Sequence, residues 1–140
     1  MKKHLAKIIF VFALSLTSCD SEKALKGLMF GMEKMMGGGF FPSEEILALG
    51  EFERSEVNVK KEIVNGVHSG RIELRLYNGK SDAYKHNEES TARECADLYV
   101  KRFSKIEDYQ EITIYFIQTD PLNMENIAIT EYMFEVEDFL

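Results

Sequence analysis

Few side chains of this 140-residue sequence have the types and spacing that catalysis or metal binding requires. One group surrounds His86 and consists of hydroxyl and carboxyl side chains that are close to it in the sequence: Ser81, Asp82, Glu88 and Glu89. A serine, an acid and an imidazole can form a nucleophilic set, and an imidazole with carboxylates can bind a metal ion. No nucleophile-elbow, HExxH or CxxC pattern accompanies the group. The pattern favours a polar loop that leads into a helix, and a small hydrolase around His86 stays open as an alternative.

A second group consists of thioethers in the segment from Lys23 to Pro42. Four methionines lie there at helical spacing: Met29, Met32, Met35 and Met36. Thioethers are soft ligands that suit Cu(I), so copper handling by this cluster is one interpretation. No histidine or cysteine joins the cluster, and methionine also fills irregular apolar surfaces. We expect a short amphipathic helix that ends at Gly37-Gly38-Gly39, with the three glycines acting as a flexible joint.

The two cysteines have different surroundings in the sequence. Cys95 lies on the apolar side of a predicted helix, where we expect a buried and unreactive thiol. Cys19 follows a start with three lysines, an apolar run from Ile8 to Leu16 and two small residues. This order is the layout of a secretory signal peptide, which we assign to residues 1–18.

The segment Leu16-Thr17-Ser18-Cys19 resembles the lipobox of bacterial lipoproteins. The resemblance implies that the signal peptide is removed and that Cys19 carries a covalent diacylglyceryl group. We expect no other cofactor. Stable anchoring takes two or three acyl chains, because a single chain binds reversibly. The resemblance therefore implies a lipid-anchored, non-cytoplasmic protein of the cell envelope. Its partner is then the bacterial membrane, which it binds through the lipid. Asp20 fits a signal for inner-membrane retention and a signal for surface export, so the choice of membrane stays open.

The chain that follows the signal peptide is acidic. Residues 19–140 contain 24 acidic and 14 basic side chains, a net charge of −10. Such a protein binds nucleic acid poorly and is repelled by anionic lipid headgroups. We therefore expect no nucleic-acid partner, and we assign the anchoring to the lipid on Cys19 rather than to surface charge.

The most specific structural prediction is a β-hairpin around Asn65-Gly66. Apolar and polar residues alternate on both sides of this dipeptide, which is typical of a two-residue hairpin turn. A turn at this point pairs Val64 with Val67. The pairing places the apolar residues of both strands on one face: Val57, Val59, Ile72 and Leu74.

A helix and two further strands complete the predicted domain, which spans residues 43–140 after a lipidated Met/Gly-rich tether at 19–42. Apolar residues at helical spacing predict a helix from Glu88 to about Ile106. Alternating apolar residues then predict two strands, the last with a bulge or a bend near Thr130. The order strand, strand, helix, strand, strand predicts an α+β two-layer sandwich, with a mostly antiparallel sheet and one long helix packed on one face.

The outer face of the predicted sheet is the last candidate site. Mixed charges and tyrosines are typical of wet protein-binding surfaces, and also of ordinary solvated sheets. Four of its residues are our candidate contacts: Arg71, Arg75, Tyr77 and Tyr115. The sequence predicts a membrane-anchored envelope lipoprotein with a small non-enzymatic domain that binds an envelope protein or a peptide. Copper handling and a small hydrolase are the alternatives.

Overall fold

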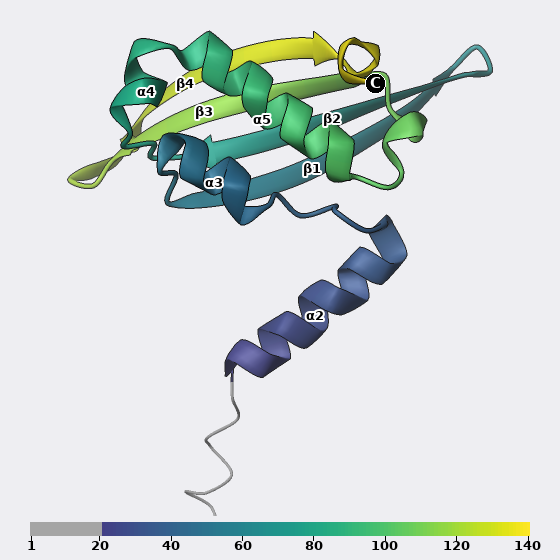
Figure 1. Cartoon of the computed structure of the whole chain (residues 1–140), viewed down its shortest axis with the longest axis horizontal. Helices are drawn as coiled ribbons and strands as arrows, with labels where there is room; N and C mark the ends of the chain where they lie inside the picture. The colour runs from purple at the N-terminus through teal and green to yellow at the C-terminus, as the bar shows by residue number, and fades with distance from the viewer. Residues whose placement is uncertain (1–20) are drawn as a thin grey trace, which may run out of the picture. The chain divides into compact units, whose positions relative to one another are not determined.

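The computed structural model describes residues 21–140 (Figure 1). The predicted signal peptide and the lipobox with Cys19 lie outside the described residues. The contacts divide the chain into two units, one that ends at Met35 and a compact domain, Met36–Leu140. In the first unit the structure describes the helix α2 (Ser21–Met36), which ends directly before the three glycines. A helix is therefore present in the segment where the sequence predicted one.

The domain combines a four-stranded sheet with helices that pack on one of its faces (Figure 1). Its elements follow each other along the chain as α3 (Glu44–Gly50), β1 (Arg54–Val64), β2 (Val67–Tyr77), α4 (Asp82–His86), α5 (Glu88–Arg102), η1 (Ile106–Asp108), β3 (Glu111–Asp120), β4 (Asn123–Glu135) and η2 (Val136–Phe139), where η marks a 3-10 helix. The predicted α+β class, with a helix between two pairs of strands, is confirmed.

The sheet is mixed, and its strands lie in the order β1-β2-β3-β4. The pairings β1 with β2 and β3 with β4 are antiparallel, whereas β2 and β3 are parallel. The central pairing is parallel because the chain crosses over the sheet through α4 and α5 before β3 begins. The two hairpins therefore join side by side in one sheet.

The predicted hairpin is confirmed residue by residue. Val64 pairs with Val67, and the register continues without a break to Arg54 and Tyr77. Asn65 and Gly66 have φ angles of 53° and 78°. Positive φ at both central positions defines a turn whose twist matches that of the strands, and Asn-Gly adopts it at low cost.

The hydrophobic core lies between the sheet and α5. The central strands contribute residues that are almost fully buried: Ile72, Leu74, Leu76, Ile112, Ile114 and Phe116. The apolar stripe predicted on the helix faces them and is also buried: Ala92, Cys95, Ala96, Tyr99, Phe103 and Ile106. The helix is shorter than expected, because α5 ends at Arg102 and Ile106 enters the core from η1.

The compact domain begins upstream of residue 43, where the sequence placed its start. Phe40 is 5% exposed and belongs to the core, where its ring packs edge-on against Phe103. The Tyr99 hydroxyl donates a hydrogen bond of 2.7 Å to the Phe40 carbonyl oxygen. These contacts attach residues 36–42 to the domain.

The three glycines are part of this contact, and they are held against the end of α5. The Ser104 N–H donates to the Gly38 carbonyl oxygen at 2.9 Å. Gly39 has a φ of 76°, and a Cβ atom at this position would lie 2.2 Å from the carbonyl oxygen of Arg102. The glycines therefore allow two backbones to approach closely, and this close packing replaces the flexible joint that we expected.

Phe40→Ala should destabilise the domain strongly, because it removes a buried ring from the core. We expect the free energy of unfolding to fall by about 3–5 kcal/mol in chemical denaturation. Phe30→Ala is the matched control, since Phe30 lies on α2 and is 70% exposed. A chain that starts at Ser43 should likewise melt at a lower temperature than one that starts at Met36. Equal stability of the two chains would contradict this placement of the domain boundary.

Candidate functional site

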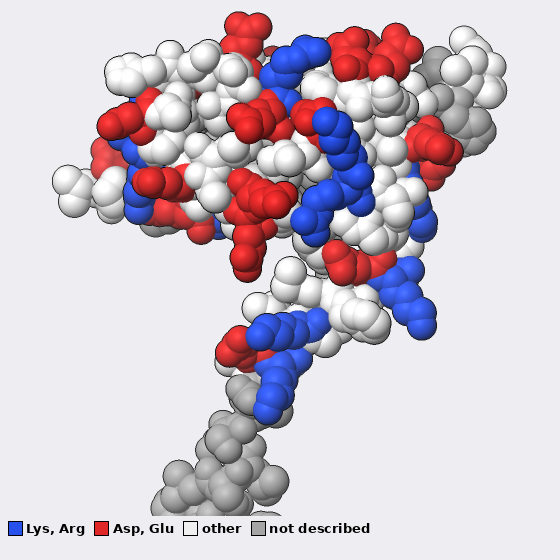
Figure 2. Space-filling view, in the orientation of Figure 1, with Lys and Arg blue, Asp and Glu red and all other residues white. Residues whose placement is uncertain are grey.

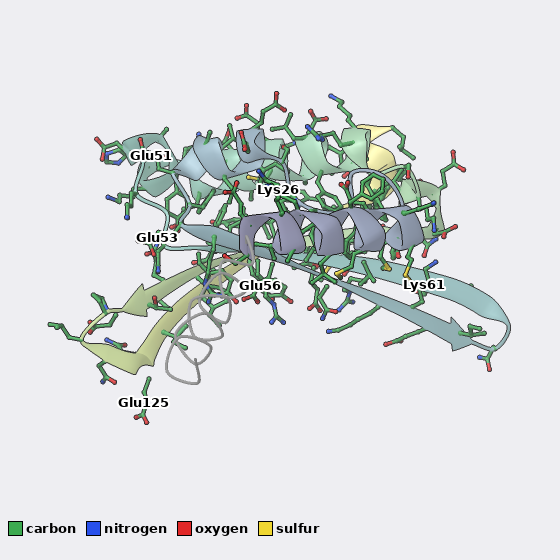
Figure 3. The ribbon with its side chains drawn as sticks, turned by 90° about the horizontal axis from the view of Figure 1, so that it is seen from below. Lys26, Glu51, Glu53, Glu56, Lys61 and Glu125 are labelled. Atoms are coloured by element: carbon green, nitrogen blue, oxygen red, sulfur yellow. The ribbon has the colours of Figure 1, made fainter. Side chains whose placement is uncertain are left out.

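The candidate site is the face of the sheet that points away from α5. Residues at alternate positions of β2 and β3 form its centre, and three register pairs define it: Arg71 with Glu111, Glu73 with Thr113, and Arg75 with Tyr115. In Figure 3, Glu56 of β1 lies on this side of the sheet. All four predicted contact residues therefore lie on one face, and Arg75 and Tyr115 are direct neighbours. We call this surface the charged face.

Glu73 lies at the centre of the charged face, and its side chain is only 3% exposed. Its carboxylate accepts hydrogen bonds from Lys60 Nζ at 2.5 Å, Arg75 Nη2 at 3.3 Å and Asn58 Nδ2 at 3.4 Å. Burial by itself would raise the pKa of Glu73. The hydrogen bond and charge of Lys60, with the charge of Arg75, outweigh this effect, so the pKa lies below its ordinary value of 4.5. Glu73 is thus a buried anion that fixes two cations in place.

Tyr77 is held by contacts within the charged face, and little of its side chain is free to contact a partner. Its hydroxyl donates to Glu56 Oε2 at 2.8 Å, and the Arg54 guanidinium lies 3.7 Å from the centre of its ring. Arg54 also forms an ion pair with Glu56. Burial raises the pKa of the Tyr77 hydroxyl, and the hydrogen bond to Glu56 raises it further. Tyr77 is largely covered by this stack, so a partner would contact Arg54 and Glu56 first.

Arg71, Arg75 and Tyr115 remain accessible. The side chains of Arg71 and Arg75 are 44% and 40% exposed, although Arg71 pairs with Glu111 and Arg75 with Glu73. The Arg75 guanidinium lies 5.8 Å from the centre of the half-buried Tyr115 ring, within range of a cation–π interaction. Beside them, Lys60 and Arg71 line a small hollow with Glu62 and Ser69. These groups form a rigid arrangement of donors with an aromatic ring.

Apolar residues of β4 border the charged face, and the sequence did not lead us to them. Ile129 is opposite Ile117, and Met133 is opposite Thr113, so both point to the same side as Tyr115. Ile127, Ile129 and Met133 are 50–60% exposed. We expected a bulge or a bend near Thr130 because Ile127 and Ile129 break the alternation. The bulge is absent: the register is regular there and shifts only at Thr119 and Asp120. The break in the alternation at Ile127 and Ile129 therefore indicated apolar residues that face away from the core.

The residues around His86 do not form a nucleophilic set. Ser81 is the N-cap of α4, where its Oγ accepts from the Tyr84 N–H at 3.2 Å and donates to the Leu49 carbonyl oxygen at 3.1 Å. The predicted loop is instead the short helix α4, which buries Tyr84 in the core. His86 is exposed at the end of that helix. The hydroxyl of Ser81 is therefore engaged in backbone contacts rather than paired with an imidazole.

The metal-binding candidates among the described residues are of two kinds, carboxylate or imidazole groups and the methionines of α2. Within residues 21–140 no three His, Cys, Asp or Glu side chains are grouped as a metal site would require. The four methionines of the predicted copper cluster all lie on α2. One of them, Met36, also packs against the core of the domain. Cys95 is fully buried, and burial raises the pKa of its thiol to about 12. A thiol of this kind has little thiolate and is unreactive.

Comparisons with known proteins leave the chain without an assigned relative. No family model, no characterised protein and no solved structure matches it. In the part of the chain that the structure describes, no helix is both long and apolar enough to cross a membrane. The candidate site therefore depends on its geometry alone.

Glu73→Gln should lower the stability of the domain at neutral pH, because it removes the charge that Lys60 and Arg75 bind. We expect a loss of about 1–3 kcal/mol. The lowered pKa of Glu73 stabilises the fold above the ordinary pKa, and this contribution disappears as the pH falls through the lower, folded-state value.

The measurement is the free energy of unfolding of the wild-type chain and the variant from pH 7 into the acid range. The difference between the two proteins should shrink on acidification. Glu125→Gln, in the exposed β3–β4 hairpin, is the control and should change stability little. A difference between wild type and Glu73→Gln that stays constant with pH would show that the Glu73 charge does not stabilise the fold.

Proposed function

We propose that this chain is a lipid-anchored protein of the bacterial cell envelope, whose domain binds a protein or peptide partner through the charged face. The observation that carries the binding function is the composition of that face. Accessible Arg71, Arg75 and Tyr115 surround the buried Glu73, and exposed apolar residues of β4 lie next to them. The anchoring part of the proposal is supported by the lipobox-like segment that ends at Cys19.

Arginine and tyrosine are the side chains that most often supply binding energy at protein interfaces. Their cost on binding is the loss of side-chain freedom, about 0.5–1.5 kcal/mol for each immobilised chain. In the charged face this freedom is already reduced, because Glu73 holds Arg75 and Glu111 holds Arg71. A partner with carboxylate groups can then compete for the exposed sides of these guanidinium groups.

The apolar residues of β4 can add binding free energy that the exposed charges do not supply. Ile127, Ile129 and Met133 expose apolar surface along one edge strand, where Glu131 lies between Ile129 and Met133. Burying such surface contributes about 25 cal/mol per Å², whereas exposed ion pairs contribute little. An apolar border beside donors and an aromatic ring is the composition of a protein interface rather than that of a small-molecule pocket.

Cys19→Ala should abolish membrane anchoring, because it removes the sulfur that the acyl chains require. The expected result is a chain that no longer incorporates a palmitate analogue in growing cells and that leaves the membrane fraction or keeps its signal peptide. Cys95→Ala is the matched control, since its buried thiol should be irrelevant to labelling. Labelling that persists in Cys19→Ala would rule out lipidation at this residue.

Photo-crosslinking tests the binding surface. Benzoylphenylalanine in place of Tyr115 should yield an adduct of one defined mass in intact cells, and Arg75→Ala in the same chain should reduce its yield. The control position is Lys101 on the solvent side of α5. Equal adducts from both positions, or no adduct from position 115, would overturn the assignment. The thermal unfolding of the Arg75→Ala chain shows whether a lost adduct reflects a lost contact or a lost fold.

A further inference from the structure

We propose that α2 is an interfacial helix, which lies along the surface of the bilayer with its leucine and methionine side in the lipid. The inference rests on the proposed function in one respect, since it takes the membrane beside Cys19 as the surface that the helix meets. It assigns a role to a helix that has no residue in the charged face and of which Met36, its last residue, packs against the core of the domain.

The apolar residues of α2 lie on one side of the helix. At about 100° per residue they fill a continuous arc of about 140°: Ala24, Leu25, Leu28, Met29, Met32 and Met35. The opposite side carries the charged residues: Glu22, Lys23, Lys26, Glu33 and Lys34. Lys26 and Glu22 form an ion pair of 2.7 Å along that side. Phe30 is the one large apolar residue on the charged side. This division is typical of helices that lie in a membrane interface.

Much of the apolar arc is exposed. α2 has no buried residue, and four of the large side chains of the arc are 41–61% exposed: Leu25, Leu28, Met29 and Met32. Contiguous apolar surface of this kind marks a site that meets a membrane or a partner. Methionine is suited to the disordered boundary between headgroups and acyl chains, because its unbranched side chain adapts to irregular surroundings.

The position of α2 in the chain identifies the bilayer as the surface that covers this arc. The helix begins at Ser21, two residues after Cys19. Two extended residues span about 7 Å at most. Acyl chains on Cys19 would therefore bring the first turn of the helix to the headgroup region. Its 16 residues extend about 24 Å, which is less than the hydrocarbon thickness of about 30 Å, and charged residues lie in both its first and its last turns. The helix accordingly fits on the surface of a bilayer rather than across it.

The distribution of charge favours the same assignment. α2 contains three lysines and two glutamates, a net charge of +1, whereas residues 37–140 contain 21 acidic and 11 basic side chains, a net charge of −10. Figure 2 shows acidic side chains spread over the helix-covered face of the domain. Anionic headgroups attract lysines near the surface and repel an acidic domain. The helix is thus the part of the described chain whose charge is compatible with an anionic bilayer.

The sequence contains no tryptophan, so a single introduced indole reports on α2 without background. The test uses residues 19–140 with Cys19→Ser and an N-terminal hexahistidine tag. Vesicles of phosphatidylcholine, phosphatidylglycerol and a nickel-chelating lipid bind the tag and take the place of the acyl anchor. Met32→Trp places the indole in the apolar arc, and Phe30→Trp places it on the charged side as a conservative control.

On vesicles, the emission of Met32→Trp should shift to the blue and be quenched by lipids with brominated acyl chains. The emission of Phe30→Trp should change little. The proposal is overturned if Met32→Trp stays solvent-like on vesicles. It is also overturned if the emission is equally blue-shifted without vesicles and insensitive to brominated lipid, because the arc would then pack on protein. Quenching of both variants alike would exclude a defined orientation. Since the tag replaces the lipid, none of these outcomes depends on whether Cys19 is acylated in cells, which the labelling experiment decides separately.

Discussion

The parallel pairing of β2 with β3 is the constraint on which the rest of the domain depends. Each antiparallel hairpin forms locally, but the two become one sheet only through the register from Arg71 and Glu111 to Tyr77 and Ile117. Parallel neighbours require a crossover of a dozen or more residues. Here the crossover contains α4 and α5, and it lies on one face of the sheet (Figure 1). The core therefore forms on that side, and the charged face is left on the other.

The same pairing explains why a carboxylate is buried on the face that no helix covers. Glu73 lies on a central strand, so neighbouring strands flank it on both sides, and Thr113 opposite it is fully buried as well. A buried charge is costly unless charged and hydrogen-bonding groups surround it. Lys60 and Asn58 of β1 and Arg75 of β2 satisfy it. The order that these contacts impose on the charged face is a consequence of sheet geometry, and the binding function that we propose relies on it.

The features that could be predicted from the sequence are those set by local pattern. Asn65-Gly66 determines its hairpin register within a few residues, and the stripe from Ala92 to Ile106 identifies its buried side without knowledge of the partner strands. The parallel pairing joins segments about forty residues apart, and no local pattern encodes it. Likewise, the sequence places Phe40 in a glycine-rich tether. Its burial depends on contact with the end of α5, which is distant in the sequence. Of the candidate site, the shared face of Arg71, Arg75 and Tyr115 followed from alternation alone. The burial of Glu73 did not, because it depends on the strands at both sides.

The early start of the domain limits where the charged face can act in the proposed lipoprotein. Since the compact domain already begins at Met36, only Asp20 and α2 lie between Cys19 and the domain. A flexible tether of the expected length would let the domain sample a wide volume, whereas a helix of 16 residues has a fixed length of about 24 Å. Under the proposed acylation of Cys19, a partner of the charged face would therefore meet the domain near the membrane. The net charge of −10 on residues 37–140 opposes adsorption of the domain as a whole to anionic lipid.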